Sequence, residues 1–336
     1  MQQRRSFLTG LLGSGVLLAA GCSGEEPQPA PPPVESSTPT PAPTPTPTPS
    51  PKPKPKPAEV DALSGGKPSK NAVFAAKIDN LAAARPQFGI SKADVIVVEE
   101  VEARLTRLVG IFHTTFPTAV GPVRSARNTD VEFLPLFGKP GLVYSGANSK
   151  VQANVRGSSH LVPIERNDRL RSRPAPHNVV VNLAAIAKQR KVGALPDSIG
   201  WTFADDDDAL WKKAATRGKF TEKIGSDTFT FTPKGSQYQV AVGSDVYDDA
   251  TTNKAVRADT VVVLSVKNRK DRDTTSSLSI VSETIGKGKV TVTRNGRTRS
   301  GTWERKKITD KMTFTDGDGK PITLRPGQTW LLLQGS

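Results

Sequence analysis

Short runs of apolar residues with β character alternate with turn-forming residues along the chain after residue 58. Val95–Val98 is an uninterrupted apolar run, which is typical of a strand that is buried on both faces. It belongs to the run Val95–Val101, and a second run, Leu105–Thr114, follows it. Upstream, the stretch NAVFAAKIDN has β character and stops at the turn pair Asp79-Asn80. These runs predict strands separated by short connections.

Three segments have helical features. Ser125 is a candidate N-cap for a helix that ends near Gly138, and a second helix is predicted from Leu183 to Lys191. The run Asp205–Asp208 precedes a third helix, because carboxylates favour the positive end of a helix dipole. A calcium site is the alternative interpretation of this run, although four consecutive aspartates do not alternate as ligand loops do.

From Lys223 onward the pattern changes to short alternating strands with Asn-Gly and Asp-Gly turns. The stretches TRNGRT and TDGDGKP are both typical of hairpins. The predicted fold class is therefore α+β: an N-terminal α/β domain with a mixed sheet at residues 59–205, then a β-rich, largely antiparallel C-terminal domain at residues 206–336.

The first 22 residues have the features of an export signal that ends in a lipidation site. Arg4 and Arg5 precede a short apolar run, which is too short to span a bilayer as a mature helix. RRSFLT resembles a twin-arginine signal, and LAAGC resembles a bacterial lipobox in which Cys22 is lipidated. We therefore predict a protein that is held extracytoplasmically on the bacterial cell membrane through Cys22. The alternative is an ordinary signal peptide with a chance cysteine.

Residues 23–58 are rich in proline. Fifteen of the chain's 28 prolines fall between Pro27 and Pro57. This composition cannot bury apolar surface and favours extended polyproline II, with a reach of roughly 95 Å at about 3.1 Å per residue. The segment is predicted to be a disordered tether that holds the folded part away from the membrane.

Charge and composition narrow the function classes. The net charge of +15 favours anionic lipids, anionic wall polymers or nucleic acid as partners, with a soluble basic protein as the alternative. Nucleic acid is not expected, because the basic residues are spread with few interleaved aromatics. A single cysteine excludes an intramolecular disulfide and a cysteine-based zinc site. No metal site is predicted from three scattered histidines, and no cofactor is predicted without a phosphate-loop or dinucleotide glycine pattern.

Polar and charged residues gather at predicted turns and strand ends in the N-terminal domain. They lie in the stretches KIDN, ARPQFG, VEARLTR, GPVRSAR and RPAPHN. Together with the tail GTWERKKITDKMTFTDGDGKPITLRPGQTW, these stretches resemble the YerB-like lipoprotein family, a two-domain family of unknown function. The resemblance runs from about Asn71 to Leu333. It implies a membrane-attached envelope lipoprotein, with an α/β first domain and a β-rich second domain.

The family's characteristic positions fall on a small set of residues in this chain. By match to the family's motifs they are Asp79, Asn80, Arg85, Pro86, Glu102, Thr106, Arg107, Gly121–Arg127 and Pro176–Asn178. The chain departs from the family at Ala103-Arg104, where a glycine pair is usual, and at Val98, where a glutamate is common.

The leading hypothesis is that the N-terminal domain binds an anionic ligand in an arginine-rich polar cleft. The ligand would be a wall polymer or a phosphorylated or carboxylated small molecule. The expected binding residues are Asp79, Asn80, Arg85, Glu102, Arg107, Arg124, Ser125, Arg127, His177 and Asn178. One alternative is an envelope hydrolase that uses His177 with Glu102 or Asp79. Another is a scaffold that binds an envelope protein through the β-rich domain.

The two arginines of GPVRSAR allow two interpretations. If Ser125 begins a helix, Arg124 and Arg127 would add planar donors beside its free amides, an arrangement suited to carboxylate or phosphate. Alternatively, both arginines pair internally, for example with Glu99, Glu100 or Glu102, and only brace the fold.

Overall fold

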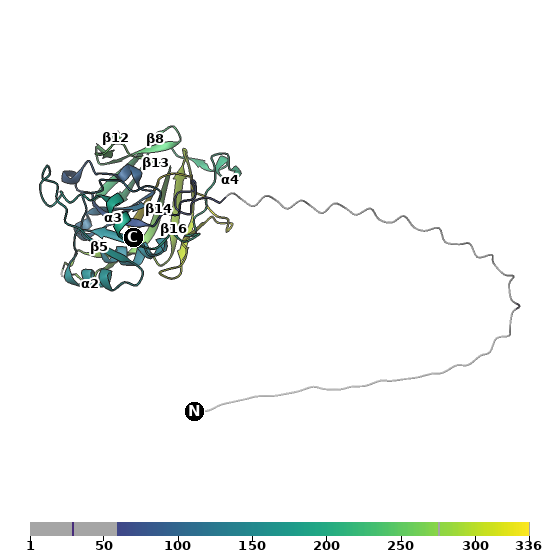
Figure 1. Ribbon diagram of the computed structural model, residues 1–336. Coiled ribbons are helices and arrows are strands. Elements are labelled where there is room, and N and C mark those ends of the chain that lie inside the picture. Colours follow the sequence, from purple (N-terminus) through teal and green to yellow (C-terminus); the bar gives the residue numbers. More distant parts are fainter. Residues whose placement is uncertain (1–28, 30–58, 275, 336) are drawn as a thin grey trace, which may run out of the picture. The chain divides into compact units, whose positions relative to one another are not determined.

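A sheet of twelve strands runs through both halves of the folded chain in a computed structural model of the protein (Figure 1). The structure describes residues 29, 59–274 and 276–335. The predicted export signal, Cys22 and, apart from Pro29, the tether lie outside the described residues. No helix among the described residues is long and apolar enough to cross a membrane.

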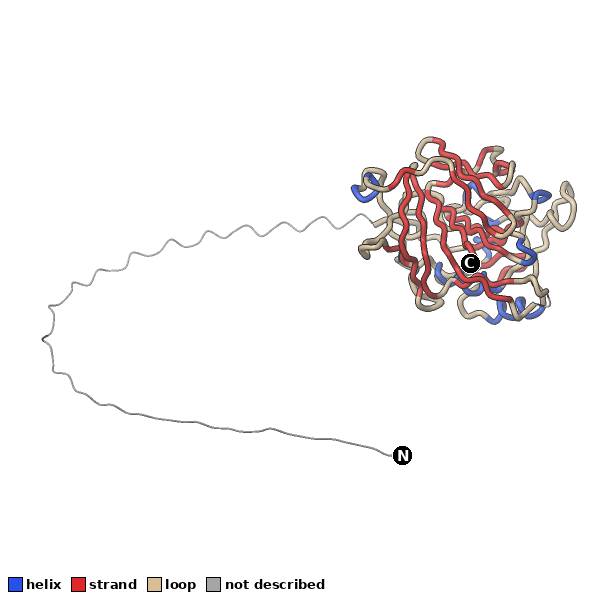
Figure 2. The backbone as a smooth tube through the Cα atoms, turned by 180° about the vertical axis from the view of Figure 1, so that it is seen from behind, coloured by secondary structure: helices blue, strands red, loops and turns tan. Residues whose placement is uncertain are grey.

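Strands make up most of the regular structure, and the helices are short and lie around the sheets (Figure 2). The twelve-stranded sheet contains β1 (Phe74–Asp79), β2 (Val95–Glu100), β3 (Thr106–Phe112), β4 (Gly141–Tyr144), β5 (Val162–Glu165), β6 (Ala215–Thr216), β14 (Thr260–Lys270), β15 (Ile280–Glu283), β16 (Gly286–Arg294), β17 (Arg297–Arg305), β18 (Thr313–Thr315) and β19 (Thr329–Gly335). A five-stranded sheet contains β7 (Phe220–Ile224), β8 (Asp227–Lys234), β9 (Gln237–Val242), β10 (Asp245–Val246) and β13 (Arg257–Ala258). A two-stranded ribbon contains β11 (Asp248–Asp249) and β12 (Lys254–Ala255).

The helical elements are equally brief. The α-helices are α1 (Asn128–Phe133), α2 (Ser149–Gly157), α3 (Leu183–Gln189) and α4 (Ala209–Lys212). Single 3-10 turns are η1 (Ala82–Ala84), η2 (Ile90–Lys92), η3 (Glu102–Arg104) and η4 (Leu134–Phe137).

The large sheet is mixed, and strands from the two halves of the chain are neighbours in it. Its order is β18-β17-β16-β14-β19-β2-β3-β1-β4-β5, with β15 paired to β14 and β6 to β17. The C-terminal strand β19 lies between β14 and β2 and is parallel to both. The predicted fold class is confirmed, with a mixed sheet in the first half and mainly antiparallel pairs in the second. The insertion of β19 beside β2 was not predicted.

Both faces of the central strands are buried. Alternate residues of β2 enter two different apolar clusters, Val95 and Val97 on one face and Ile96 and Val98 on the other. The first cluster includes side chains of α1 and α2, and the second includes α3 and the five-stranded sheet. Because each face has its own cover, an uninterrupted apolar strand is stable here, as the run at Val95 predicted.

The helix predicted from Ser125 differs from the observed one. Its N-cap is Arg127, not Ser125, because the Asp130 carboxylate accepts the Arg127 backbone N–H at 2.8 Å. The α-helix ends at Phe133, and the single turn η4 follows it. Pro135 explains this change, since proline has no N–H for a continuing α-helical ladder. The predicted helix start at Ser125 is therefore wrong, because α1 begins after Arg127 and has six residues.

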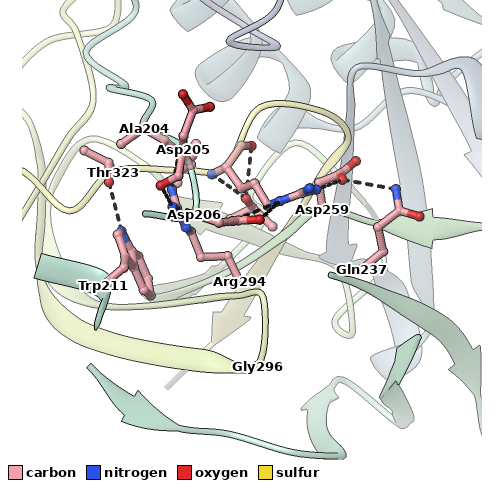
Figure 3. A network of polar contacts seen from close by, with 12 residues as sticks. Ala204, Asp205, Asp206, Trp211, Gln237, Asp259, Arg294, Gly296 and Thr323 are labelled. Atoms are coloured by element: carbon pink, nitrogen blue, oxygen red, sulfur yellow. Dashed lines mark hydrogen bonds and ion pairs between the residues drawn. The ribbon is translucent and has the colours of Figure 1, made fainter. Parts of the chain in front are cut away.

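Two side chains of the run Asp205–Asp208 contact other groups of the protein. Asp208 caps α4 by accepting the Leu210 backbone N–H at 2.7 Å, as the sequence predicted for a helix start. Asp206 lies 3.1 Å from Arg325 Nε and 3.8 Å from the buried guanidinium of Arg294 (Figure 3). Arg294 also donates to the Ala204 carbonyl at 2.6 Å. Asp206 and the Ala204 carbonyl therefore hold the segment before α4 against Arg294 of β16, whereas Asp208 acts within α4.

An ion pair fastens the first described residues to the end of β3. His113 Nε2 lies 3.1 Å from Asp61 Oδ2, and both side chains are buried. The backbone amide of His113 donates to Asp94 Oδ2 at 2.6 Å. Burial opposes ionisation of both partners, but their mutual contact outweighs it. The pKa of His113 is raised, and that of Asp61 is lowered to about 2.

We predict that His113→Gln makes the stability of the protein less dependent on pH. A raised His pKa stabilises the fold below about pH 6.5, and this contribution is lost as pH rises through the folded-state value. A lowered Asp pKa stabilises it above about pH 4 and is lost as pH falls toward 2. Urea unfolding should show the variant to be about 1.5–3 kcal/mol less stable than wild type at about pH 5, with a smaller difference at about pH 9.

His160→Gln is the control, because its ring makes no recorded ion pair with the described residues. An equal loss of stability at both pH values in His113→Gln would contradict this assignment.

Candidate functional site

Charged side chains take the place of apolar ones at one end of the sheet face that α1 and α2 cover. The strand register places Arg107 of β3 between Asp79 of β1 and Glu99 of β2. Side chains alternate along a strand, so Lys77 and Asp79 share the face of Ala75, which belongs to the apolar cluster under the helices. The end of this face therefore holds buried charges that must be paired.

One of these charges is Lys77, whose side chain is completely buried. Its ammonium forms ion pairs with Glu99 and, at 2.8 Å, with Asp130 of α1. One cation thus forms ion pairs with two buried carboxylates. Burial raises the pKa of Glu99, the charge of Lys77 opposes this shift and that of Asp130 adds to it, which leaves the pKa at about 7.

Glu102, in the turn after β2, joins two arginines. Arg127 donates to both of its carboxylate oxygens, with Nε at 2.8 Å and Nη2 at 2.6 and 2.7 Å. Arg107 Nη2 donates to the same carboxylate at 3.3 Å. Burial alone would raise the pKa of Glu102, but the bonds and charges of the arginines lower it to about 2. Glu102 is therefore held ionised.

Asp79 also contacts two basic side chains, in this case through its Oδ2 atom. His177 Nδ1 lies 2.7 Å from this oxygen, and Arg124 Nε lies 3.2 Å from it at ion-pair distance. Asp79 is fully buried, whereas His177 and Arg124 are 13 and 19 % exposed. The histidine is therefore oriented by a buried carboxylate, and part of each basic side chain remains open to solvent.

The cluster retains hydrogen-bond donors that have no partner among the described residues. Arg107 is 95 % buried, yet its Nη1 atom has no acceptor there. Burial lowers the pKa of Arg107, and the nearby charges of Arg127 and Arg124 act in the same direction. Only Nε and Nη1 of Arg124 have recorded contacts, and the latter is a long 3.4 Å bond to the Pro176 carbonyl. Among the described residues, the arginines of the cluster therefore have more N–H donors than acceptors that they contact.

A cleft of about 290 Å³ opens beside Glu102 and Arg127. Its other lining residues all carry hydroxyl or amide groups: Ser125, Asn148, Thr274, Ser276 and Ser279. The last three come from the loop after β14, so the second half of the chain supplies one wall. Hydroxyl and amide groups both donate and accept hydrogen bonds, as the hydroxyls of a glycan do.

The structure brings together only some of the predicted site residues. Asp79, Glu102, Arg107, Arg124, Arg127 and His177 form the linked cluster, and Ser125 lines the cleft. Arg124, Arg107 and His177 do not line the cleft itself. Cys22 lies outside the described residues.

Three predicted residues point elsewhere. Asn80 donates to Thr106 at 2.7 Å and accepts from Tyr247, beside the five-stranded sheet. Arg85 lies over the Tyr247 ring and pairs with Asp245 at 2.9 Å. Asn178 accepts from Arg169 at 3.1 Å. Asn80 and Arg85 thus connect the end of β1 to the five-stranded sheet, whereas Asn178 holds together two parts of the loop between β5 and α3.

The turn between β2 and β3 explains one departure from the family pattern. Ala103 and Arg104 have φ values of 54° and 61°, a left-handed conformation that glycine adopts without strain. The Arg104 carbonyl accepts the Ser226 amide at 2.7 Å, so the turn is held against the five-stranded sheet. This contact supports the strained backbone without glycine.

Sequence reasoning missed Lys77, Asp130 and the residues of the loop after β14. One feature of the sequence could have identified Lys77: it is a lone cation inside an apolar strand with the pattern FAAKID. Such a residue, on a strand whose faces are both covered, requires a buried carboxylate partner. The serines and threonine of the loop gave no comparable signal.

Comparisons with known proteins match most of the folded chain. The N-terminal domain of a family described as a protein of unknown function (DUF3048) matches residues 62–194, and its C-terminal domain matches residues 216–331. A curated Bacillus subtilis protein described as "Putative lipoprotein YerB" is 43% identical over 61 residues, which is 18% of each chain. This match therefore spans less than a fifth of that relative's length.

A solved structure supports the same fold. The crystal structure of YerB protein from Bacillus subtilis superposes with a TM-score of 0.67 at 21% identity. The likeness covers 82% of this chain and 96% of that one. At this identity the likeness shows the fold alone.

Proposed function

This chain belongs to the DUF3048 family, and we propose that it is a membrane-anchored envelope lipoprotein that binds an anionic, hydroxyl-bearing ligand at its arginine cluster. The observation that carries the proposal is the excess of buried and half-buried donors. Arg107 Nη1 has no partner among the described residues, although an unpaired buried donor costs about 1–3 kcal/mol. An anion would satisfy it.

The charges of the cluster support an anion rather than a cation as the ligand. Around Asp79 and Glu102, three guanidinium groups face these two carboxylates, and His177 adds a further basic group. Guanidinium groups suit carboxylate and phosphate because their donors are planar and paired. The hydroxyl-lined cleft beside Glu102 supports an acidic wall polymer in preference to a small inorganic ion.

The two arginines of GPVRSAR have different roles in this proposal. Arg127 is committed to Glu102 through three donor contacts and to the Ala126 carbonyl at 2.8 Å. It therefore braces the turn after β2, which is the alternative interpretation of this motif. Arg124 makes one ion pair and one long bond, so it is free to contact a ligand.

We predict that Arg124→Gln removes anion binding with little loss of stability, whereas Arg127→Gln lowers stability by about 1–3 kcal/mol. Thermal unfolding with and without sulfate measures both effects. Sulfate at about a hundred times its Kd should stabilise wild type by about 2.7 kcal/mol and Arg124→Gln by much less.

Arg156→Gln is the matched control, because Arg156 is exposed and its recorded partners among the described residues are Glu165 of β5 and Tyr144 of β4. If neither sulfate, phosphate nor purified wall polymer stabilises wild type, the cluster is structural and the binding function is rejected.

The membrane anchor is a separate part of the proposal. Cys22 follows small residues at the end of a short apolar run, and a relative carries the description of a lipoprotein. We predict that Cys22→Ser moves the protein from the membrane fraction to the soluble fraction, since the acyl chains would be lost. Immunoblots of both fractions measure this, with Ser23→Ala as the control. Membrane retention of Cys22→Ser would contradict lipidation at this residue.

Hydrolysis of envelope material is a second candidate function, and one observation favours it. His177 Nδ1 meets the buried Asp79 at 2.7 Å, the arrangement that orients a histidine as a general base. Glu102, the other carboxylate partner considered for His177, is instead committed to two arginines.

If the protein is a hydrolase, His177→Gln should lower turnover of purified wall material by at least about a hundredfold, the usual contribution of a general base. The same variant should still be stabilised by sulfate, although less than wild type, because Arg124 remains. No turnover by wild type, or unchanged turnover by the variant, would exclude this function for His177.

A scaffold role through the β-rich half has less support. Within residues 59–274 and 276–335, the exposed large apolar side chains are Val60, Val246, Leu278 and Ile285. They are scattered along the sequence and include only three residues of the second half, which is normal for a soluble surface.

A further inference from the structure

We infer that the buried group Lys77–Glu99–Asp130 links anion binding at the arginine cluster to the uptake of one proton by Glu99. This inference rests on the proposed anion site and concerns its regulation. Binding would strengthen as pH falls through neutrality, so the protein would hold its ligand more firmly on an acidified cell surface.

The geometry places Glu99 directly behind the proposed anion site. It lies opposite Arg107 in the register of β2 and β3, and Lys77 contacts it from β1. Asp130 approaches from α1 by sharing Lys77, and the charge of Arg127 also acts on Glu99. The side chain is 1 % exposed, so any change in its charge is felt by these neighbours with little screening by water.

Without counting His177, the charges of the network balance only when Glu99 is ionised. Four cations, Lys77, Arg107, Arg124 and Arg127, face four carboxylates, Asp79, Glu99, Glu102 and Asp130. Protonation of Glu99 removes one negative charge and leaves the network positive beside the free donor of Arg107. An anion restores the balance. Ligand and proton therefore favour each other, as linkage requires.

Glu99 is the member of the network best placed to take up this proton. It shares its lysine with Asp130, which also accepts the Arg127 backbone N–H at 2.8 Å, whereas Glu102 has two arginines to itself. Burial without a full counter-charge favours the neutral form of a carboxyl group. Glu99 has no recorded contact with the cleft, so a substitution there changes charge without removing a ligand contact.

The test is sulfate binding measured by isothermal titration at about pH 6 and about pH 8, where the charge of sulfate does not change. Wild type should bind about five- to tenfold more tightly at the lower pH, a coupling of ordinary size. Glu99→Gln mimics the protonated group and should bind equally at both pH values, with the affinity that wild type has at the lower pH.

Two variants separate Glu99 from other sources of pH dependence. His177 contacts Asp79 in the same cluster, so His177→Gln should keep the preference for the lower pH if Glu99 is responsible. Glu304→Gln, at an exposed and distant glutamate, should behave as wild type. A Glu99→Gln protein that binds sulfate with the full pH dependence of wild type overturns the inference and leaves the anion site intact.

Failure of wild type to bind sulfate at either pH rejects the anion site and the coupling together. If Glu99→Gln does not fold, titrations of His177→Gln in two buffers of different ionisation enthalpy replace it. A net uptake of about half a proton or more per sulfate near pH 7 supports the inference, and no uptake overturns it.

Discussion

The burial of Lys77 and Arg107 on the core-facing side of one sheet is the constraint on which the site depends. Two cations that leave water need carboxylates at hydrogen-bond distance, and β2 and the turn after it supply Glu99 for Lys77 and Glu102 for Arg107. Asp130 must then approach from the helix side. The position of α1 is therefore set by charge pairing as well as by its apolar contacts.

The sequence predicted those parts of the fold and of the charged cluster that depend on residues close together in the chain. The strands at Phe74–Asp79 and Val95–Glu100 followed from apolar runs with clear turn signals, and the polar residues predicted at their ends belong to the charged cluster. A hairpin joined by Glu102-Ala103-Arg104 brings Glu102 close to Arg107 through local geometry alone. These parts of the fold and of the cluster depend on neighbours within a few residues.

Contacts between segments that lie far apart in the sequence could not be predicted in this way. Asp79 and His177 are 98 positions apart, and no hydrophobic periodicity in the sequence indicates that the strand of Asp79 contacts the loop of His177. The apolar run at Val95 required covered faces but did not name its partners, so the parallel strand β19 was missed. Ser125 was an acceptable N-cap by type, yet Asp130 supplied the competing carboxylate and moved the helix start to Arg127.

The insertion of β19 between β14 and β2 brings residues of the two family segments around one cleft. The charged residues stand on strands of the first segment, whereas Thr274, Ser276 and Ser279 of the second form a wall of the cleft. Each segment alone would leave something exposed: β2 would lose its neighbour β19, and Glu102 and Arg127 would lose the loop that faces them. A ligand held in this cleft therefore contacts both segments, and its binding depends on the same sheet continuity that buries Lys77.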